Sequence, residues 1–140
     1  MIRKKLFILD DNGSFAESLA DVLSQQGFEV KWAAQAPKAR TLARSFLPDV
    51  LIVDINLVTA SGIEVAQQFA HDQIARGFVF LTGSVDLDYR DIPELLKPMA
   101  VILHKPVAKE DLLDAIARLS NGGSAPVRSN VTDSTSSQPS

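Results

Sequence analysis

The stretch Val50-Leu-Ile-Val-Asp54 is apolar over four positions and then ends in a carboxylate. A run this short, without a polar residue and rich in β-branched side chains, is typical of a strand buried on both faces of a parallel sheet. Pro48, two residues earlier, ends any helix that precedes the run. The stretch therefore predicts a central strand that carries Asp54 to the edge of a sheet.

Four further apolar runs lie on either side of this strand. Three are apolar throughout, whereas the run that begins at Phe28 alternates in polarity, as expected of an edge strand. The runs are Leu6–Leu9, Phe28–Trp32, Phe78–Leu81 and Ala100–Leu103. Because helix-like segments separate most of them, the sequence predicts an open α/β sheet with right-handed crossovers and helices on both faces.

The helical segments have recognisable ends. The first begins with the capping-box pattern Ser14-Phe-Ala-Glu17 and stops at Gly27. The second has Pro37 near its start and is ended by Pro48. The third and the last are predicted from about Gly62 to Arg76 and from about Lys109 to Leu119.

The segment between Ser84 and Met99 differs from the others. It contains Pro93 and Pro98 and only a brief apolar nucleus, Glu94-Leu-Leu96. A proline inside a helix costs about 3 kcal/mol, because it removes a hydrogen bond and clashes with the preceding turn. A short or irregular fourth helix is therefore predicted here.

Bulk composition narrows the classes of function. The 140 residues include 46% hydrophobic and 22% charged residues, with a net charge of -3 and no cysteine. One compact domain over residues 1–120 is expected, followed by a Ser- and Gly-rich tail or linker over residues 121–140. Disulfides and thiol chemistry are excluded, and neither a membrane span nor a signal peptide is evident. We expect a cytoplasmic protein with no direct nucleic-acid or membrane binding.

Polar residues follow four of the predicted strands. They are Asp10 and Asp11, Asp54, Thr82, and Lys105. The carboxyl ends of parallel strands meet at one edge of the sheet, so these side chains are expected to lie close together. Each alone is more often a turn residue or a solvated side chain. Together they predict a functional site.

The expected chemistry follows from these side chains. Three carboxylates brought together raise one another's pKa unless a cation joins them, and Mg²⁺ is the commonest hard cation with oxygen ligands. Lys105 adds a compact positive charge suited to a phosphoryl oxygen, and Thr82 can donate a hydrogen bond to another.

The chain resembles the receiver domain of two-component response regulators from Lys4 to about Ser120. The matching motifs are Asp10-Asp11-Asn12, Val53-Asp54, Gly62, Thr82-Gly83 and Lys105-Pro106. The resemblance implies a doubly wound, flavodoxin-like sheet with strand order 2-1-3-4-5. It also implies a cis peptide bond between Lys105 and Pro106.

The resemblance further implies a role for each site residue. Asp54 would be the phosphoacceptor, taking its phosphoryl group from a histidine kinase or a histidine phosphotransfer protein. Asp11 would bind Mg²⁺ directly, with Asp10 holding a coordinated water and the Asn56 carbonyl completing the protein ligands. Lys105 and Thr82 would contact phosphoryl oxygens, and a changed surface would engage a downstream protein. Such a chain is not an enzyme, since it catalyses only its own phosphorylation and dephosphorylation.

Two positions depart from the family pattern. Ile102 stands where most receivers have an aromatic switch residue, and Val58 stands where a proline is common. The stretch Asp91-Ile-Pro-Glu94 resembles the FAT GUY subgroup, although Phe80-Leu-Thr-Gly-Ser84 differs from the Phe-Ala-Thr-Gly-Tyr motif of that subgroup.

Three other functions fit parts of the sequence. A phosphatase of the haloacid dehalogenase type has a motif similar to Val53–Val58, but it needs a second carboxylate where this chain has Asn56. A receiver cut from a longer regulator with an output domain fits the linker-like end. A degenerate receiver that serves only as a docking surface fits Ile102.

Overall fold

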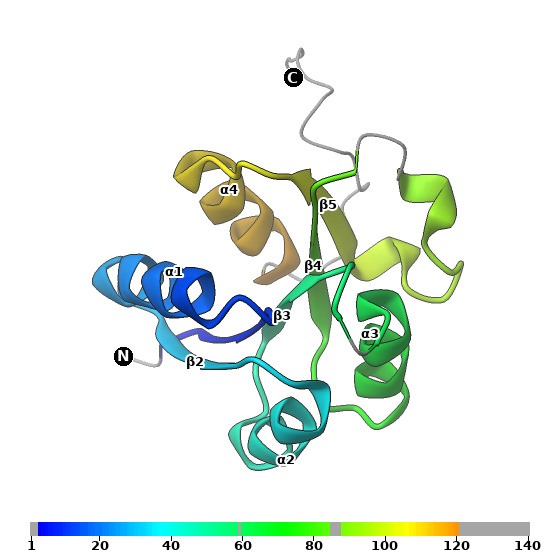
Figure 1. Cartoon of the computed structure of the whole chain (residues 1–140), viewed down its shortest axis with the longest axis horizontal. Coiled ribbons are helices and arrows are strands. Elements are labelled where there is room, and N and C mark those ends of the chain that lie inside the picture. The colour runs from blue at the N-terminus through cyan, green and yellow to red at the C-terminus, as the bar shows by residue number, and fades with distance from the viewer. Residues whose placement is uncertain (1–2, 59, 85–87, 121–140) are drawn as a thin grey trace.

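The structure is a computed structural model, and it describes residues 3–58, 60–84 and 88–120. Five parallel strands form one sheet in the order β2-β1-β3-β4-β5, with helices on both faces (Figure 1). The strands are β1 Lys5–Leu9, β2 Glu29–Ala33, β3 Val50–Asp54, β4 Gly77–Thr82 and β5 Ala100–His104. The predicted sheet and strand order are confirmed.

Each central strand divides its side chains between two apolar layers. In β1, Leu6 and Ile8 face one layer and Phe7 and Leu9 face the other, and all four are fully buried. A strand buried on both faces must be apolar at every position, which is why β1, β3, β4 and β5 read as continuous apolar runs. At the β2 edge, Trp32 is only partly buried.

Within the described residues, four α-helices cover the sheet, and Figure 1 shows that they lie on both of its faces. The first and last pack on the layer that contains Leu6, and the second and third pack on the layer that contains Phe7. Their bounds are α1 Gly13–Gln25, α2 Ala36–Phe46, α3 Gly62–His71 and α4 Lys109–Ser120.

Two predicted helix ends are corrected by the structure. The N-cap of α1 is Asn12, whose side-chain oxygen accepts the Phe15 N–H at 3.1 Å, so the predicted capping box at Ser14 is wrong. Asparagine caps a helix as well as serine does. Helix α3 ends at His71 rather than at Arg76, because Gln73 adopts a left-handed conformation and Ile74 turns into the core.

The segment before β5 is irregular, as predicted. Its described part contains two short 3₁₀ turns, Tyr89–Asp91 and Lys97–Met99, in place of a full helix. Ile92 and Leu96 are buried and anchor the segment to the α2–α3 layer. Pro93 lies between the turns, where no helical hydrogen bond is lost.

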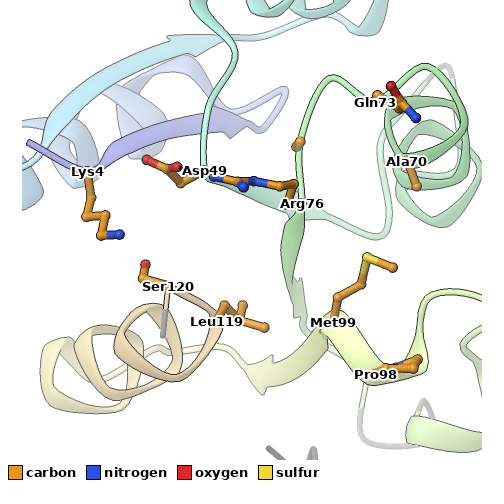
Figure 2. A pocket seen from close by; sticks show the side chains of 10 residues that line it. Lys4, Asp49, Ala70, Gln73, Arg76, Pro98, Met99, Leu119 and Ser120 are labelled. Carbon is orange, nitrogen blue, oxygen red and sulfur yellow. Dashed lines mark hydrogen bonds and ion pairs between the residues drawn. The ribbon is translucent and has the colours of Figure 1, made fainter. Parts of the chain in front are cut away.

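The amino ends and the carboxyl ends of the strands carry different features. A pocket of about 700 Å³ at the amino edge is lined by residues that include Lys4, Asp49, Arg76, Met99 and Ser120 (Figure 2). The strand-end residues of the candidate site lie at the opposite, carboxyl edge, so this pocket is not part of that site.

Among the described residues, no helix is long and apolar enough to cross a membrane. The predicted tail, 121–140, lies outside the described residues.

Candidate functional site

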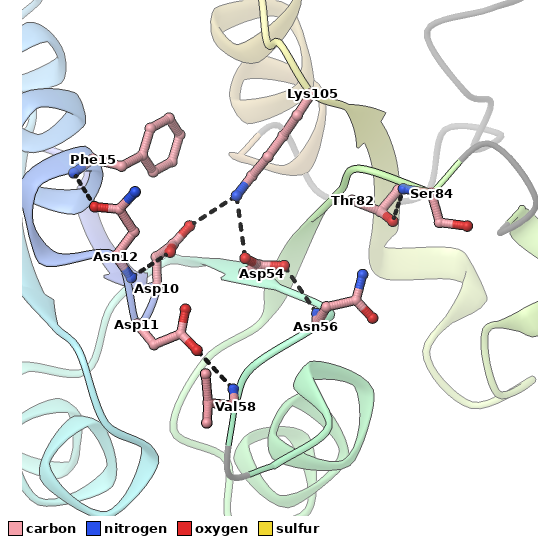
Figure 3. A network of polar contacts seen from close by, with 10 residues as sticks. All are labelled: Asp10, Asp11, Asn12, Phe15, Asp54, Asn56, Val58, Thr82, Ser84 and Lys105. Carbon is pink, nitrogen blue, oxygen red and sulfur yellow. Dashed lines mark hydrogen bonds and ion pairs between the residues drawn. The ribbon is translucent and has the colours of Figure 1, made fainter.

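Three strands end in the same kind of turn at the carboxyl edge. In each, the last polar side chain accepts a hydrogen bond from the backbone N–H two residues further on. The pairs are Asn12 N–H to Asp10 Oδ1 at 2.9 Å, Asn56 N–H to Asp54 Oδ1 at 2.9 Å, and Ser84 N–H to Thr82 Oγ1 at 3.0 Å (Figure 3). These turns fix the orientation of each side chain before any ligand arrives.

Lys105 joins two of these strand ends. Its ammonium nitrogen lies 3.2 Å from Asp10 Oδ2 and 3.1 Å from Asp54 Oδ2. Asp10 is 1% exposed and Asp54 is 9% exposed, so both carboxylates are held in a poorly hydrated setting. The peptide bond between Lys105 and Pro106 is cis, as the resemblance implied. A lysine directly after β5 therefore partly neutralises one carboxylate directly after β1 and another at the end of β3.

Burial and charge shift two pKa values in this cluster. Burial raises the pKa of Asp10, and the neighbouring Asp54 charge adds to the shift, while the Asn12 N–H and Lys105 oppose it. Burial alone would lower the pKa of Lys105, but its hydrogen bonds to and charge interactions with Asp54 and Asp10 outweigh burial, so the pKa is raised. Lys105 thus stays positive, whereas an ionised Asp10 weakens the fold.

The oxygen atoms around this cluster fit a hard divalent cation. One carboxylate oxygen from each of Asp10, Asp11 and Asp54 lies within 4.8 Å of the other two. All three donors are oxygens, which suits Mg²⁺ or Ca²⁺ rather than a thiophilic metal. Asp11 is more exposed than the other two, and its Oδ2 accepts the Val58 N–H at 2.6 Å. That bond ties the loop after β1 to the loop after β3.

Thr82 and Asn56 also lie at the carboxyl ends of the strands, but the contacts they make differ from those of Lys105. Thr82 is fully buried, and within the described part of the chain its hydroxyl is hydrogen-bonded to Ser84 rather than to Asp54. Asn56 contacts Asp54 through its backbone N–H, and its carbonyl as a metal ligand stays a prediction. Ile102, in the position of the usual aromatic switch, is 1% exposed and belongs to the α2–α3 layer.

Three contacts at the site were not predicted from the sequence. The Phe15 ring lies beside the Lys105 ammonium, the Val58 N–H binds Asp11, and Gly62 packs against the backbone of Asp54. The position of Phe15 in the first turn after the aspartate pair was the available signal. That position alone does not indicate a site residue, because an aromatic residue on a helix face is usually a core residue.

Gly62 is required for the close approach of α3 to the end of β3. A Cβ atom there would lie 2.8 Å from Ile55 Cα and 2.9 Å from the Asp54 carbonyl carbon. We expect Gly62→Ala to lower the free energy of unfolding by about 1–3 kcal/mol, since the backbone that carries Asp54 must shift. Urea denaturation measures the effect. Gly83→Ala is the matched control, because nothing lies within 4 Å of a Cβ there, and equal losses in both variants would contradict the steric explanation.

The buried carboxyl of Asp10 should limit stability. Because its pKa is raised, Asp10 stabilises the fold below 3.8, its ordinary pKa, and this contribution is lost as the pH rises through the raised value. Asparagine stays neutral throughout. We expect Asp10→Asn to be more stable than the wild type without metal, by on the order of 1 kcal/mol.

The pH dependence provides the control for this prediction. Urea denaturation in a chelator at a series of pH values upward from 3.8, the ordinary pKa of Asp10, should give a larger difference between Asp10→Asn and the wild type at the higher pH values. A difference that shrinks as the pH rises would show that burial of the charge is not the cause.

Sheet order, buried carboxylates and a bridging lysine define a flavodoxin-like α/β domain with an acidic site at its carboxyl edge. The response regulator receiver domain family model matches residues 6–117, and the chain belongs to this family. As such it is a receiver domain of the two-component response regulators.

Several known proteins are similar to the chain. A response regulator receiver protein of Anaeromyxobacter sp. (strain Fw109-5) is 30% identical over 111 residues, which cover 79% of this chain and 46% of that protein. The DNA-binding response regulator MtrA of Mycobacterium tuberculosis (strain H37Rv) is 31% identical over 85 residues, which cover 61% of this chain and 37% of that protein. The chain thus spans less than half the length of these relatives.

A solved structure links this fold to a modified aspartate. The crystal structure of a response regulator protein from Burkholderia pseudomallei contains a phosphorylated aspartic acid, a calcium ion and citrate. It is 27% identical, with a TM-score of 0.71, and the match covers 84% of this chain and 69% of that chain.

Proposed function

We propose that this chain accepts a phosphoryl group on Asp54 in a reaction that depends on Mg²⁺. The phosphodonor would be a phosphohistidine of a histidine kinase or of a histidine phosphotransfer protein. One observation carries the proposal: Lys105 lies 3.1 Å from Asp54 Oδ2 and 3.2 Å from Asp10 Oδ2, so a buried acceptor, a cation and further acidic ligands converge on one point.

The transfer is a displacement at phosphorus. A carboxylate oxygen of Asp54 forms the new O–P bond as the P–N bond of the phosphohistidine breaks, and the electron pair passes to the imidazole nitrogen, which takes up a proton. The nucleophile is a carboxylate oxygen, so the step needs no separate base to activate it. The Asn56 N–H holds the carboxylate in a fixed orientation through Oδ1.

Positive charge beside Asp54 compensates the charge on the transferring group. Asp10, Asp11, Asp54 and the Asn56 carbonyl would hold Mg²⁺, which when bound neutralises phosphoryl charge. The oxygen-only carboxylate cluster supports this assignment, as does the calcium ion in the Burkholderia structure. Lys105 would transfer its hydrogen bonds from carboxylate oxygens to a phosphoryl oxygen.

We propose that Thr82 passes the change on to the surface. To reach a phosphoryl oxygen, its hydroxyl would give up the bond to the Ser84 N–H, so the loop after β4 would lose one of the contacts that fix it. Ile102 has no polar group to follow this movement. The altered surface would therefore be centred on residues 82–84 and on the irregular segment 88–99, where a downstream protein would bind.

The rival phosphatase activity has less support. Such an enzyme needs a general acid two residues after its nucleophile, and Asn56 cannot supply one. We therefore propose that the chain turns over only its own phosphoryl group and works in the cytoplasm. Nucleic-acid binding, the property named for MtrA, would need a domain other than this one, since the receiver carries a net charge of -3.

Phosphorylation by a small phosphodonor tests the proposal. The purified protein is incubated with acetyl phosphate, with and without Mg²⁺, and its intact mass is measured. One added phosphoryl group, formed only with Mg²⁺ and removed by hydroxylamine as acyl phosphates are, is the expected result. Rapid hydrolysis of a generic phosphate ester would instead support the phosphatase, and no labelling at all would support a docking-only receiver.

A further inference from the structure

Lys105 has a third neighbour besides its two carboxylates. Its ammonium nitrogen lies 4.8 Å from the centroid of the Phe15 ring, within the range of a cation–π contact. Figure 3 shows the ring and the two carboxylates around the end of the same lysine side chain. The ring comes from α1, whereas the lysine comes from the end of β5.

The position of the ring follows from the turn that ends β1. Asp10 accepts the Asn12 N–H, and Asn12 in turn caps α1 by accepting the Phe15 N–H. Phe15 therefore occupies the first turn of a helix whose start is fixed by the acidic site. The side chain is only partly buried and packs on the α1–α4 layer. The chain thus holds an aromatic face at the site without needing it for the centre of the core.

A lysine needs such support more than an arginine would. Its four-carbon stem is flexible, and its ammonium is a strongly hydrated point charge that can hydrogen-bond in many directions. Here the Lys105 side chain is 29% exposed, so water competes for it. Two carboxylates and one ring restrict the ammonium on three sides. The ring attracts a cation without forming a hydrogen bond, so it leaves the N–H donors for oxygen acceptors.

We propose that Phe15 is a positioning residue for Lys105 in phosphoryl transfer. The ring holds the ammonium over Asp54 when the carboxylates exchange partners, so the cation is already in place when negative charge arrives on the phosphoryl oxygens. This inference rests on the proposed phosphorylation of Asp54. It assigns Phe15 a role in that reaction beyond packing.

The ring–lysine contact can be measured without phosphorylation. In the full chain, the Lys105 Cε protons should show an upfield ring-current shift by NMR, with Lys105→Ala used to assign the signal. Phe15→Leu should remove the shift, and Phe15→Tyr should keep it. A shift that is absent from the wild type, or unchanged in Phe15→Leu, would overturn the inference even if phosphorylation occurs.

The rate of phosphorylation by acetyl phosphate tests the consequence. We expect Phe15→Leu to slow it roughly two- to fivefold, the factor that an ordinary cation–π contact corresponds to, while Phe15→Tyr keeps the wild-type rate. Leu19→Ala is the packing control, because Leu19 packs on the same layer one turn later and has no aromatic ring. It should leave the rate unchanged, and equal slowing in both variants would reduce Phe15 to a packing residue.

A double-mutant cycle separates positioning from every other effect. If Phe15 acts through Lys105, Phe15→Leu should cause no further slowing in the Lys105→Ala background. The same two- to fivefold loss in both backgrounds would overturn the inference. A wild-type protein that takes up no phosphoryl group would overturn the proposed function and this role together, while the NMR shift would still report whether the contact exists.

Discussion

Asp54→Asn should reduce phosphorylation by acetyl phosphate by about three orders of magnitude or more, the size of loss seen when a covalent nucleophile is removed. The amide keeps the shape of the side chain and can still accept the Asn56 N–H, which the Asp54 carboxylate binds at 2.9 Å. It cannot attack phosphorus, because its nitrogen lone pair is delocalised. Intact mass with and without Mg²⁺ measures the loss.

A matched control shows whether the labelled group is this carboxylate. Asp114→Asn removes an exposed aspartate on α4, whose partner Arg118 lies 3.7 Å away. Exposed ion pairs of this kind contribute little, so the variant should label like the wild type. If Asp54→Asn still gained a phosphoryl group, another residue would be the acceptor. The contact between Lys105 and Asp54 would then not serve phosphorylation.

The sheet was predictable because its physical requirements are local. A strand buried on both faces must be apolar at each position, so the runs at Leu6, Val50, Phe78 and Ala100 could be found one at a time. Their order came from the family resemblance. The meeting of Asp10, Asp54 and Lys105 followed from the rule that parallel strands end at one edge.

The helix ends and the side-chain hydrogen bonds at the site were harder to predict, because several alternatives are compatible with the same local sequence. Asn12 and Ser14 can both cap a helix, and the turn that Asp10 forms with the Asn12 N–H decides between them. Helix α3 could have continued past His71 to Arg76, but burying Ile74 outweighs the further helical residues. The Thr82 hydroxyl accepts the Ser84 N–H, a bond that the sequence did not reveal, and its contact with a phosphoryl oxygen stays a prediction. The burial of Ile74 is a tertiary contact, whereas the turns at Asp10 and Thr82 join residues only two positions apart.

Lys105→Ala should slow phosphorylation roughly 10²–10³-fold, the loss typical of one preorganised group that stabilises developing charge. The lysine ammonium lies 3.1 and 3.2 Å from two carboxylates, so it is already beside the acceptor before its hydrogen bonds pass to a phosphoryl oxygen. Magnesium binding should persist, because the carboxylate oxygens remain. It should even tighten, since the cation no longer competes with an ammonium for Asp10 and Asp54.

Slower phosphorylation together with tighter magnesium binding would distinguish a lysine that acts in phosphoryl transfer from one that only stabilises the fold. Phosphorylation rates measured across a Mg²⁺ titration give the rate at saturation and the metal affinity independently. Lys109→Ala, an exposed lysine at the start of α4, is the control for loss of one positive charge and should alter neither quantity. A Lys105→Ala protein with a normal saturated rate would mean that Lys105 only offsets the repulsion between Asp10 and Asp54. The Lys105 charge would then serve the fold rather than the transfer, and the Phe15 contact would lose its role in phosphorylation with it.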